Sequence, residues 1–277
     1  MKRFLFFASL MLSVIASAGE PDFFFIQLSD VQIGFFDSNK TLSRDSLNFE
    51  EAVRQINRLH PAFVINTGDM LNAGTSSRQQ AVYDQILSKI DKDIPVWHVP
   101  GNHDLGKGAT DSRIEKFVSH YGCQRFSFRY NDCAFIGINS CVIKDENKPA
   151  EEEQYKWLEK ELKKASKKCK AIYVFSHYPV FIKAFDEKVT YSNLVPADRE
   201  RYWNLFRRYG VSAVVAGHLH DTKKAEYEGI GMYTSGPVGR PLGHGCSGVA
   251  VWTIKGCTGY HCDYVPLEKL DEYKTNN

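Results

Sequence analysis

Seven candidate metal ligands, chosen by side-chain type and spacing, fall in five short polar segments of this chain. The candidates are Asp30, Gln32, Asp69, Asn102, His177, His218 and His220. Carboxylates, imidazoles and amide oxygens, with no thiolate among them, form a set of oxygen and nitrogen donors. Such a set suits Mn, Fe or Zn rather than a soft metal ion. The residue types therefore predict a site for divalent or mixed-valence cations.

Each polar segment follows a short apolar run that we expect to be a buried strand. The runs are rich in Val, Ile and Phe, are bounded by turn residues, and span residues 23–28, 62–66, 95–99, 171–175 and 212–216. In open α/β sheets, ligands bind outside the carboxyl ends of the strands. The candidates should therefore converge on one rim of a sheet. Gly68, Gly101 and Gly217 each precede a candidate, where the chain has to turn sharply off a strand.

If the site holds two cations, one carboxylate has to bridge them, because such ions lie roughly 3.5–4 Å apart. A pair of this kind lowers the pKa of a bound water. It also holds the attacking and the leaving oxygen of an in-line displacement. The donor set therefore suits a hydrolysis in which activated water attacks in line with the leaving group.

The remaining pattern predicts a layered α/β fold, with mixed sheets covered by helices. Apolar residues recur at helical spacing in residues 49–59 and 155–165, and we expect further helices at 77–90, 112–121 and 198–209. Antiparallel strands flanking short turns are expected at residues 125–130, 133–139, 223–228, 232–235, 249–254 and 260–265. The polar residues 271–277 should fray.

In chain order, the motifs Asp-x-Gln, Gly-Asp, Gly-Asn-His-Asp, His and Gly-His-x-His resemble those of the calcineurin-like metallophosphoesterase superfamily. They cover residues 23–220, and Gly-Asn-His-Asp is the most specific of them. The Asp-x-Gln opening, residues 176–181, and residues 239–244 with the final hairpin are similar to the calcineurin-like phosphoesterase domain-containing protein 1 subgroup. That subgroup includes a protein serine/threonine phosphatase. The resemblance implies a β-sandwich flanked by helices, with metal ions at the carboxyl ends of strands.

The resemblance also implies a role for each candidate. The first ion would be held by Asp30, Gln32, Asp69 and His220. The second would be held by Asp69, Asn102, His177 and His218, so that Asp69 bridges the two. His103 would sit over the phosphoryl group as a donor to the leaving oxygen, and Asp104 would orient His103. The commonest family pattern has His in place of Gln32, and a neutral amide oxygen is the weaker ligand, although the subgroup shares the Gln.

Taken singly, several of these residues have an ordinary structural interpretation. An Asp after a strand is usually a turn or cap residue, which applies to Asp30 and Asp69, and His177 alone would suit a hydrogen-bonded core histidine. The joint occurrence in the family order favours the functional interpretation. In the Gly-rich loop after the expected strand at residues 232–235, Arg240 and His244 are candidates for substrate contact. Most loop histidines have no such role, which applies to His244.

We therefore predict a phosphomonoesterase that acts on a small phosphate ester or a phosphoprotein. One alternative keeps the site and changes the substrate to phosphodiesters, such as nucleotides or lipid head groups. Another is a binding protein that holds a phosphorylated ligand between its ions without cleaving it. The formal net charge of +2 shows no basic excess, so no nucleic-acid partner is expected.

The first residues predict export. Met1–Arg3 are basic at two of three positions, residues 4–15 are mostly apolar, and Ala16-Ser17-Ala18 matches the pattern that signal peptidase cleaves. The alternatives are a first core strand or a membrane anchor. With residues 1–18 removed as a signal peptide, residues 19–277 would form the phosphoesterase domain in the periplasm or outside the cell. No stable membrane span is then expected.

The chain has seven cysteines, and the odd number leaves at least one without an intramolecular partner. Cys257 and Cys262 are close enough in sequence for a local disulfide. Buried free thiols are the alternative for Cys133, Cys141 and Cys169, which lie in or beside apolar runs. The absence of a C-x-x-C pair argues against a structural zinc site.

Overall fold

The computed structural model describes residues 22–106 and 108–274. The predicted signal peptide, residues 1–18, lies outside them, and so does the end of the segment expected to fray, residues 275–277. None of the helices in the described residues combines the length and the hydropathy needed to cross a bilayer.

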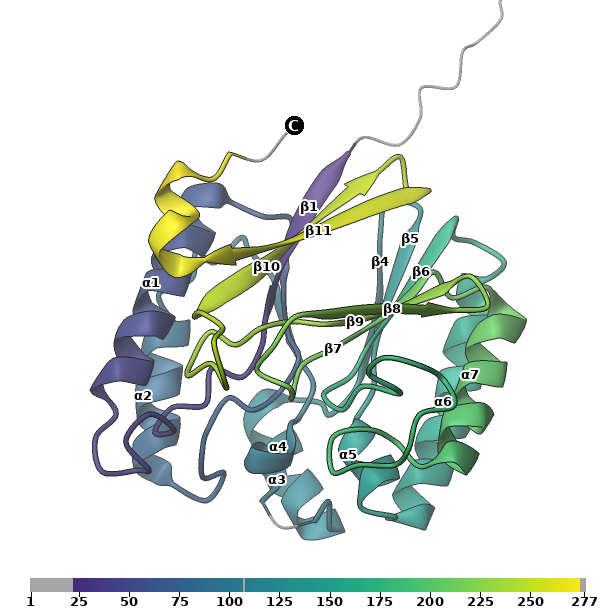
Figure 1. Ribbon diagram of the computed structural model, residues 1–277, viewed down its shortest axis with the longest axis horizontal. Helices are drawn as coiled ribbons and strands as arrows, with labels where there is room; N and C mark the ends of the chain where they lie inside the picture. Colours follow the sequence, from purple (N-terminus) through teal and green to yellow (C-terminus); the bar gives the residue numbers. More distant parts are fainter. Residues whose placement is uncertain (1–21, 107, 275–277) are drawn as a thin grey trace, which may run out of the picture.

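Two mixed sheets pack face to face at the centre of the molecule (Figure 1). In spatial order, the first contains β11 (Gly259–Pro266), β10 (Gly248–Lys255), β1 (Phe23–Leu28), β2 (Val64–Asn66) and β3 (Val96–His98). The second contains β4 (Phe126–Tyr130), β5 (Cys133–Gly137), β6 (Ala171–Phe175), β7 (Ala213–Ala216), β9 (Ile230–Thr234) and β8 (Lys223–Tyr227). The pairs β1–β2–β3 and β5–β6–β7–β9 are parallel.

Helices cover the outer face of each sheet. On one side lie α1 (Ser43–Leu59) and α2 (Ser77–Leu87), and on the other α6 (Lys148–Ala165) and α7 (Pro196–Tyr209) (Figure 1). The helices α3 (Asn102–Leu105), α4 (Asp111–Tyr121) and α5 (Ser140–Lys144) gather at the lower end, and the 3-10 helix η1 (Leu267–Glu272) lies beside α1. Most connections between parallel strands run through helices, so within each sheet the carboxyl ends of those strands lie at the same edge.

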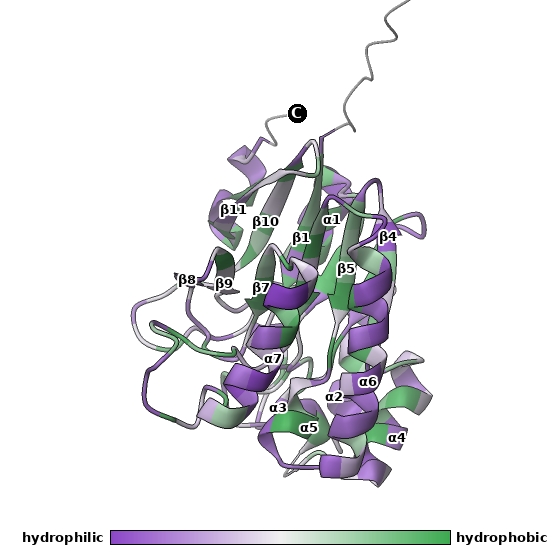
Figure 2. Cartoon of the chain, turned by 90° about the vertical axis from the view of Figure 1, so that its right-hand side faces the viewer, coloured by the Kyte–Doolittle hydropathy of each residue, from purple (hydrophilic) through white to green (hydrophobic). Residues whose placement is uncertain are grey.

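Alternate residues of the central strands enter two different cores. Phe25 points between the sheets, where its ring stacks on Trp252 at 5.9 Å and meets Phe135 edge-on at 5.5 Å. Its neighbours Phe24 and Ile26 pack into the core beneath the helices. Figure 2 shows the same division: the strands are mostly hydrophobic, and the outer helices are hydrophilic on their exposed sides. A strand buried on both faces explains the uninterrupted apolar runs in the sequence.

The structure confirms the predicted layered fold and each of the five strands that precede a polar segment, with ends that differ by at most two residues from the sequence prediction. The helix predicted at residues 49–59 begins earlier, at Ser43, and the one predicted at 77–90 ends earlier, at Leu87. The short helices α3 and α5 were not predicted, because four or five residues are too few to show a helical period.

All seven cysteines are free thiols in the structure, so the local Cys257–Cys262 disulfide does not form. Cys257 is buried in the core between the sheets beside Cys133, whereas Cys262 lies on β11 opposite Trp252. The alternative of buried free thiols is the one that the structure shows for Cys133 and Cys141.

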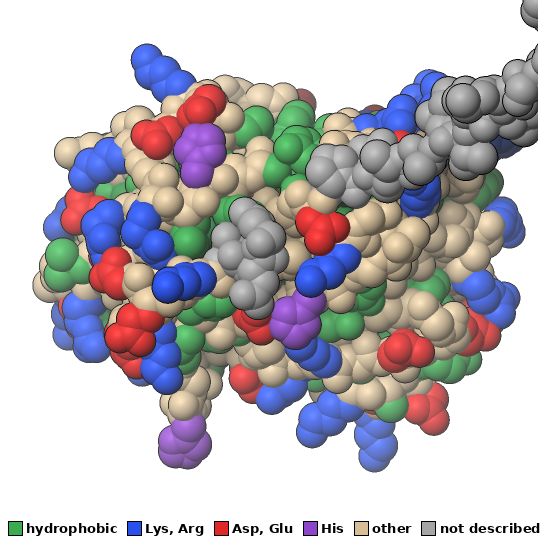
Figure 3. Space-filling view, turned by 90° about the horizontal axis from the view of Figure 1, so that it is seen from above, with side chains coloured by type: hydrophobic (Ala, Val, Ile, Leu, Met, Phe, Trp, Pro, Cys, Tyr) green, Lys and Arg blue, Asp and Glu red, His purple; other side chains and the backbone are tan. Residues whose placement is uncertain are grey.

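The end of the molecule where β1 begins is a solvated surface. Seen from above, its Lys and Arg side chains are interspersed with Asp and Glu (Figure 3). Both signs of charge on one face are typical of a surface that faces water.

A buried carboxylate in α1 holds the turn that follows Gln32. Asp45 is 1% exposed and accepts the backbone N–H groups of Gly34 (3.0 Å) and Phe36 (3.4 Å). Burial raises the pKa of Asp45 to about 6. The folded chain therefore binds this proton more tightly than the unfolded chain does. The contribution to stability is complete below about pH 4, the usual range of an Asp, and is lost as the pH rises through 6.

We expect Asp45→Asn to remove this dependence, because an amide does not titrate. Between pH 4 and pH 7, the free energy of unfolding of the wild type should fall relative to that of the variant by roughly 2–3 kcal/mol. Urea unfolding at the two pH values measures the difference. Parallel curves for the two proteins would contradict the prediction.

Candidate active site

The five polar segments meet at the carboxyl ends of their strands, as the sequence predicts. Asp30 and Gln32 follow β1, Asp69 follows β2, and Asn102 is the first residue of α3 just after β3. The three histidines come from the other sheet, with His177 after β6 and both His218 and His220 after β7. The rim therefore joins side chains from both sheets.

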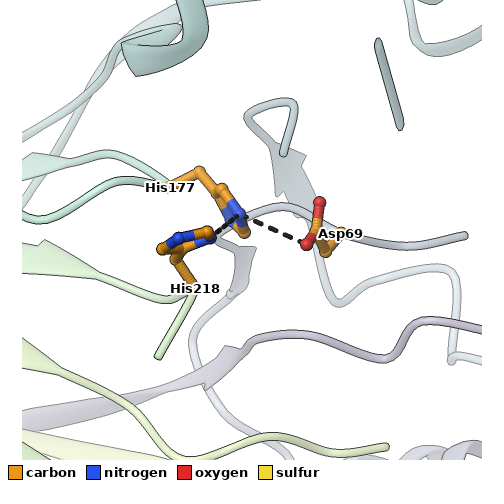
Figure 4. A group of neighbouring side chains, drawn as sticks. All are labelled: Asp69, His177 and His218. Carbon is orange, nitrogen blue, oxygen red and sulfur yellow. Dashed lines mark hydrogen bonds and ion pairs between the residues drawn. The ribbon is translucent and has the colours of Figure 1, made fainter. Parts of the chain in front are cut away.

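Four of these residues form a group around the imidazole of His177. Its Nε2 lies 3.3 Å from Asp69 Oδ2, 2.9 Å from Asn102 Oδ1 and 3.2 Å from His218 Nδ1. Figure 4 shows Asp69 and His218 on either side of this ring. One ligand-type atom of each of Asp69, His177 and His218 lies within 4.8 Å of the others, and all three residues are buried. We call Asp69, Asn102, His177 and His218 the His177 group.

A second group lies beside the first. His220 Nε2 is 3.4 Å from Asp30 Oδ1. Asp30 Oδ1 and Gln32 Oε1 are buried and accept no hydrogen bond. Buried acceptors without a donor are costly, so each of these atoms indicates a place where a positive group belongs. We call Asp30, Gln32 and His220 the Asp30 group.

Backbone carbonyls set the tautomers of two of the imidazoles. His177 Nδ1 lies 2.9 Å from the Thr67 carbonyl oxygen, and His220 Nδ1 lies 2.5 Å from the Arg240 carbonyl oxygen. Each Nδ1–H therefore donates to a carbonyl, which leaves Nε2 to face the carboxylates. This is the arrangement that orients metal-binding histidines.

The electrostatics of the His177 group favour a cation. Although burial opposes its charge, the neighbouring Asp69 raises the pKa of His177 to about 9. The same pair holds the pKa of Asp69 below its usual range against the effect of burial. Burial, together with the nearby His177, lowers the pKa of His218 to about 3. One imidazolium thus supplies the positive charge that the surrounding acceptors require. A metal ion at the same place would supply it too, with the proton on His177 Nε2 released.

The residues present therefore fit metal ions. Carboxylate, amide and imidazole donors suit Mn, Fe or Zn. Burial raises the pKa of Asp30, and the neighbouring Asp69 raises it further. Two neighbouring buried carboxylates repel each other when both are charged, and cations beside them would offset that repulsion.

The backbone is strained where it presents the ligands. Five of the seven candidates have a positive φ, between 46° and 71°: Asp30, Gln32, Asp69, His218 and His220. Such conformations are unfavourable for residues other than Gly and cluster at functional sites. Gly68, with φ of 99°, permits the turn into Asp69. Gly101 is needed for a different reason, because a Cβ there would collide with the Asp69 carboxylate.

His103 lies at the mouth of the site, but Asp104 does not orient it as the resemblance implied. His103 Nδ1 is 2.8 Å from the Asn72 carbonyl oxygen. The Asp104 carboxylate instead accepts the backbone N–H groups of Asp69 (2.8 Å), Leu71 (3.1 Å) and Gly101 (2.8 Å). Burial, and then the charge of Asp69, raises the pKa of Asp104 to about 7. Asp104 thus shapes the two loops that carry Asp69 and Asn102.

The loop candidates behave differently from each other. Arg240 reaches the rim, since its guanidinium lies 5.6 Å from the centre of the Phe35 ring and its carbonyl holds His220. His244 is exposed and, within the part of the chain that the structure describes, makes no hydrogen bond, ion pair or ring contact with the two groups. This position does not support the predicted substrate contact of His244.

Two aromatic residues at the rim were not predicted. The Phe35 ring lies 5.2 Å from that of His220 and 6.3 Å from that of His103. The Tyr191 ring lies 5.1 Å from that of His218. Phe35 stands three positions after Gln32, so its closeness to the Asp-x-Gln motif was a signal in the sequence. Tyr191 belongs to no motif and is brought to the rim only by the path of the chain between β6 and α7.

Comparison with known proteins agrees with this geometry. The sequence model of the family described as calcineurin-like phosphoesterase matches residues 25–222. The chain is 34% identical to the serine/threonine-protein phosphatase CPPED1 of Rattus norvegicus, over 90% of this chain and 86% of that protein. It is 28% identical to a probable glycerophosphodiester phosphodiesterase, GpdQ, of Arcobacter nitrofigilis, over 70% of this chain and 71% of the other. The fold is similar to that of a dimetal phosphatase from Danio rerio, with a TM-score of 0.60, 16% identity, and coverage of 83% and 92%.

Proposed function

Because the chain belongs to the calcineurin-like phosphoesterase family of metal-dependent phosphoric ester hydrolases, we propose that it is a phosphomonoesterase with a two-metal site. The observation that supports the proposal is a set of neighbouring buried ligand residues in which Asp69 interacts with both His177 and Asp30. The Asp30 group with Asp69 would hold one ion, and the His177 group would hold the other. The donor types favour Mn, Fe or Zn.

When bound, the ions would lower the pKa of water and offset the charge of the phosphoryl oxygens. The chain itself supplies the geometry. Asp69 is fixed from two sides, since its backbone N–H donates to Asp104 and its Oδ1 accepts the backbone N–H of His103 (2.8 Å). The bond from His103 also places that imidazole at a fixed distance from the bridging carboxylate. Preorganised groups of this kind need little rearrangement during the reaction.

His103 is the residue placed to move a proton. With Nδ1 bonded to the Asn72 carbonyl, the free edge of the ring carries Nε2. Protonated at Nε2, it would donate to the oxygen of the departing alcohol as the bond to phosphorus breaks. Arg240, whose guanidinium lies over Phe35 on the same rim, would contact the phosphate or its substituent.

A second candidate function, hydrolysis of phosphodiesters, is favoured by the similarity to GpdQ, although that match is weaker and covers less of the chain than the match to CPPED1. Parallel assays with phenyl phosphate and methyl phenyl phosphate separate the two. We expect phosphate release from the monoester to exceed cleavage of the diester by at least tenfold in kcat/KM. A preference for the diester would refute the monoesterase proposal and leave the metal site intact.

We also propose that the protein is exported, with cleavage after Ala18. The basic start, the apolar run and the small residues at 16 and 18 support this proposal. Sequencing the N-terminus of the protein purified from its native cells tests it. A mature chain that begins at Met1 would overturn it.

A further inference from the structure

The most exposed aromatic side chain among the described residues stands directly over the proposed active site. Tyr191 is 67% exposed. Yet its ring lies 5.1 Å from the His218 ring, and its hydroxyl accepts a hydrogen bond from Asn102 Nδ2 (3.3 Å). The hydroxyl end is thus fixed to the site, and one face of the ring remains open to solvent.

The loop that carries Tyr191, residues 182–195, is hydrogen-bonded to buried polar residues. Asn193 is fully buried; its Oδ1 accepts the backbone N–H of Thr190 (2.7 Å) and its Nδ2 donates to Glu187 (2.7 Å). Arg199, 1% exposed, donates to the carbonyls of Phe185, Glu187 and Leu194.

Two further groups fasten the ends of this loop. Glu187 accepts the backbone N–H groups of residues 182, 183 and 184. Lys144, from α5, donates to the carbonyls of Thr190 (2.8 Å) and Asn193 (2.6 Å). Burying an Asn and an Arg is costly unless their polar atoms are paired, and apart from Arg199 Nε the polar side-chain atoms of these two residues are paired here, which favours one shape for this loop. Tyr191 is therefore presented at a fixed place.

A second aromatic side chain, Phe35, stands beside the Asp30 group and His103. Phe35 contacts the rings of His220 and His103, and the Arg240 guanidinium lies over it. Tyr191 stands next to His218 and Asn102 of the His177 group, whereas Phe35 stands next to His220 of the Asp30 group. An ester whose phosphoryl group lies between the two groups would extend its alcohol past His103 and out between the two rings.

We propose that Tyr191 recognises the alcohol part of the substrate, and that the preferred substrates are phosphate monoesters whose alcohol carries an aromatic ring. The inference rests on the proposed phosphomonoesterase function. A ring held in place at one edge stacks at little entropic cost, and aromatic pairs gain over aliphatic contacts of the same area. An aliphatic alcohol of equal size gains only the burial of its surface.

The test compares two esters of similar size with similar, unactivated leaving groups: benzyl phosphate and cyclohexylmethyl phosphate. We expect the metal-loaded wild-type protein to prefer benzyl phosphate by about fivefold in kcat/KM. Tyr191→Leu should lower this ratio to about 1. Tyr191→Phe, the matched control, keeps the ring and should keep the ratio. Tyr191→Phe loses only the hydroxyl, so any change in its kcat/KM for both esters reports the lost hydrogen bond to Asn102.

The outcomes separate the two proposals. If the wild type hydrolyses neither ester, the proposed function fails. If it hydrolyses both equally, or if Tyr191→Leu keeps the preference, the function stands and the role of Tyr191 is refuted. Binding of phenylphosphonate and cyclohexylphosphonate to the wild type, measured by calorimetry, gives a second reading that needs no variant. Equal affinities would refute the role of Tyr191 as well.

Discussion

Asp69→Asn should abolish hydrolysis of phenyl phosphate, with kcat/KM falling by about 10³-fold or more, and should leave the purified protein with fewer than two metal ions per chain. The physical reason is that Asp69, which lies 3.3 Å from His177 and interacts through its charge with Asp30, is the carboxylate proposed to bridge the two ions. An amide keeps the shape and can still accept the His103 N–H, but it removes the negative charge between the two ions. A loss of about 4 kcal/mol of transition-state stabilisation corresponds to that factor of 10³.

The same variant should also change the metal-free protein. The charge of Asp69 is what raises the pKa of His177 against the effect of burial, so Asp69→Asn should lower the pKa of His177. Nuclear magnetic resonance of the histidine ring protons measures this pKa. Asp93→Asn is the matched control, because Asp93 is exposed and pairs with the exposed His60. If Asp69→Asn retained two ions and most of its activity, the bridging role of Asp69 would be wrong.

His103→Ala should lower kcat for benzyl phosphate by about 10²–10³-fold and leave the content of metal ions unchanged. No ligand atom is lost, since the imidazole contacts the Asn72 carbonyl and the backbone of His103 contacts Asp69. The variant loses proton donation to the leaving oxygen, and general acid catalysis of this kind typically raises the rate by about 10²–10⁴-fold. The variant should therefore separate turnover from metal binding.

The size of the His103 effect should depend on the leaving group. An acidic alcohol such as 4-nitrophenol departs without a proton, so the loss with its phosphate ester should be at least tenfold smaller than with benzyl phosphate. His60→Ala, a substitution of an exposed histidine, serves as the control. An equal loss with both esters would exclude an acid role and would assign His103 to the stabilisation of phosphoryl charge.

Much of the site was predictable because the strands that carry it are local features of the sequence. A run such as residues 23–28 shows its strand directly, and the rule that ligands gather at the carboxyl ends of strands then places Asp30, Asp69 and His177 on one rim. The resemblance to the family divided these residues between two ions, and that division stays a prediction; the structure places Asp69, Asn102, His177 and His218 in one group and His220 beside Asp30.

Other features were not predictable, because they depend on contacts between distant segments. Asp104 follows His103 in the sequence, yet it binds the backbone of Asp69 rather than the imidazole. Tyr191 is one exposed aromatic residue in a polar loop, and nothing in its neighbourhood in the sequence relates it to Asn102, which precedes it by 89 positions. Likewise, the short spacing of Cys257 and Cys262 allowed a local disulfide, whereas the fold buries Cys257 beside Cys133.

The central claim is that two cations meet at this rim and share Asp69. Anomalous X-ray diffraction from crystals of the protein grown with Mn²⁺ tests it most directly. We predict two anomalous peaks, roughly 3.5–4 Å apart, on either side of the Asp69 carboxylate. One should lie against Asp30 and His220, and the other against His177 and His218. A single peak, or two peaks without Asp69 between them, would contradict the account.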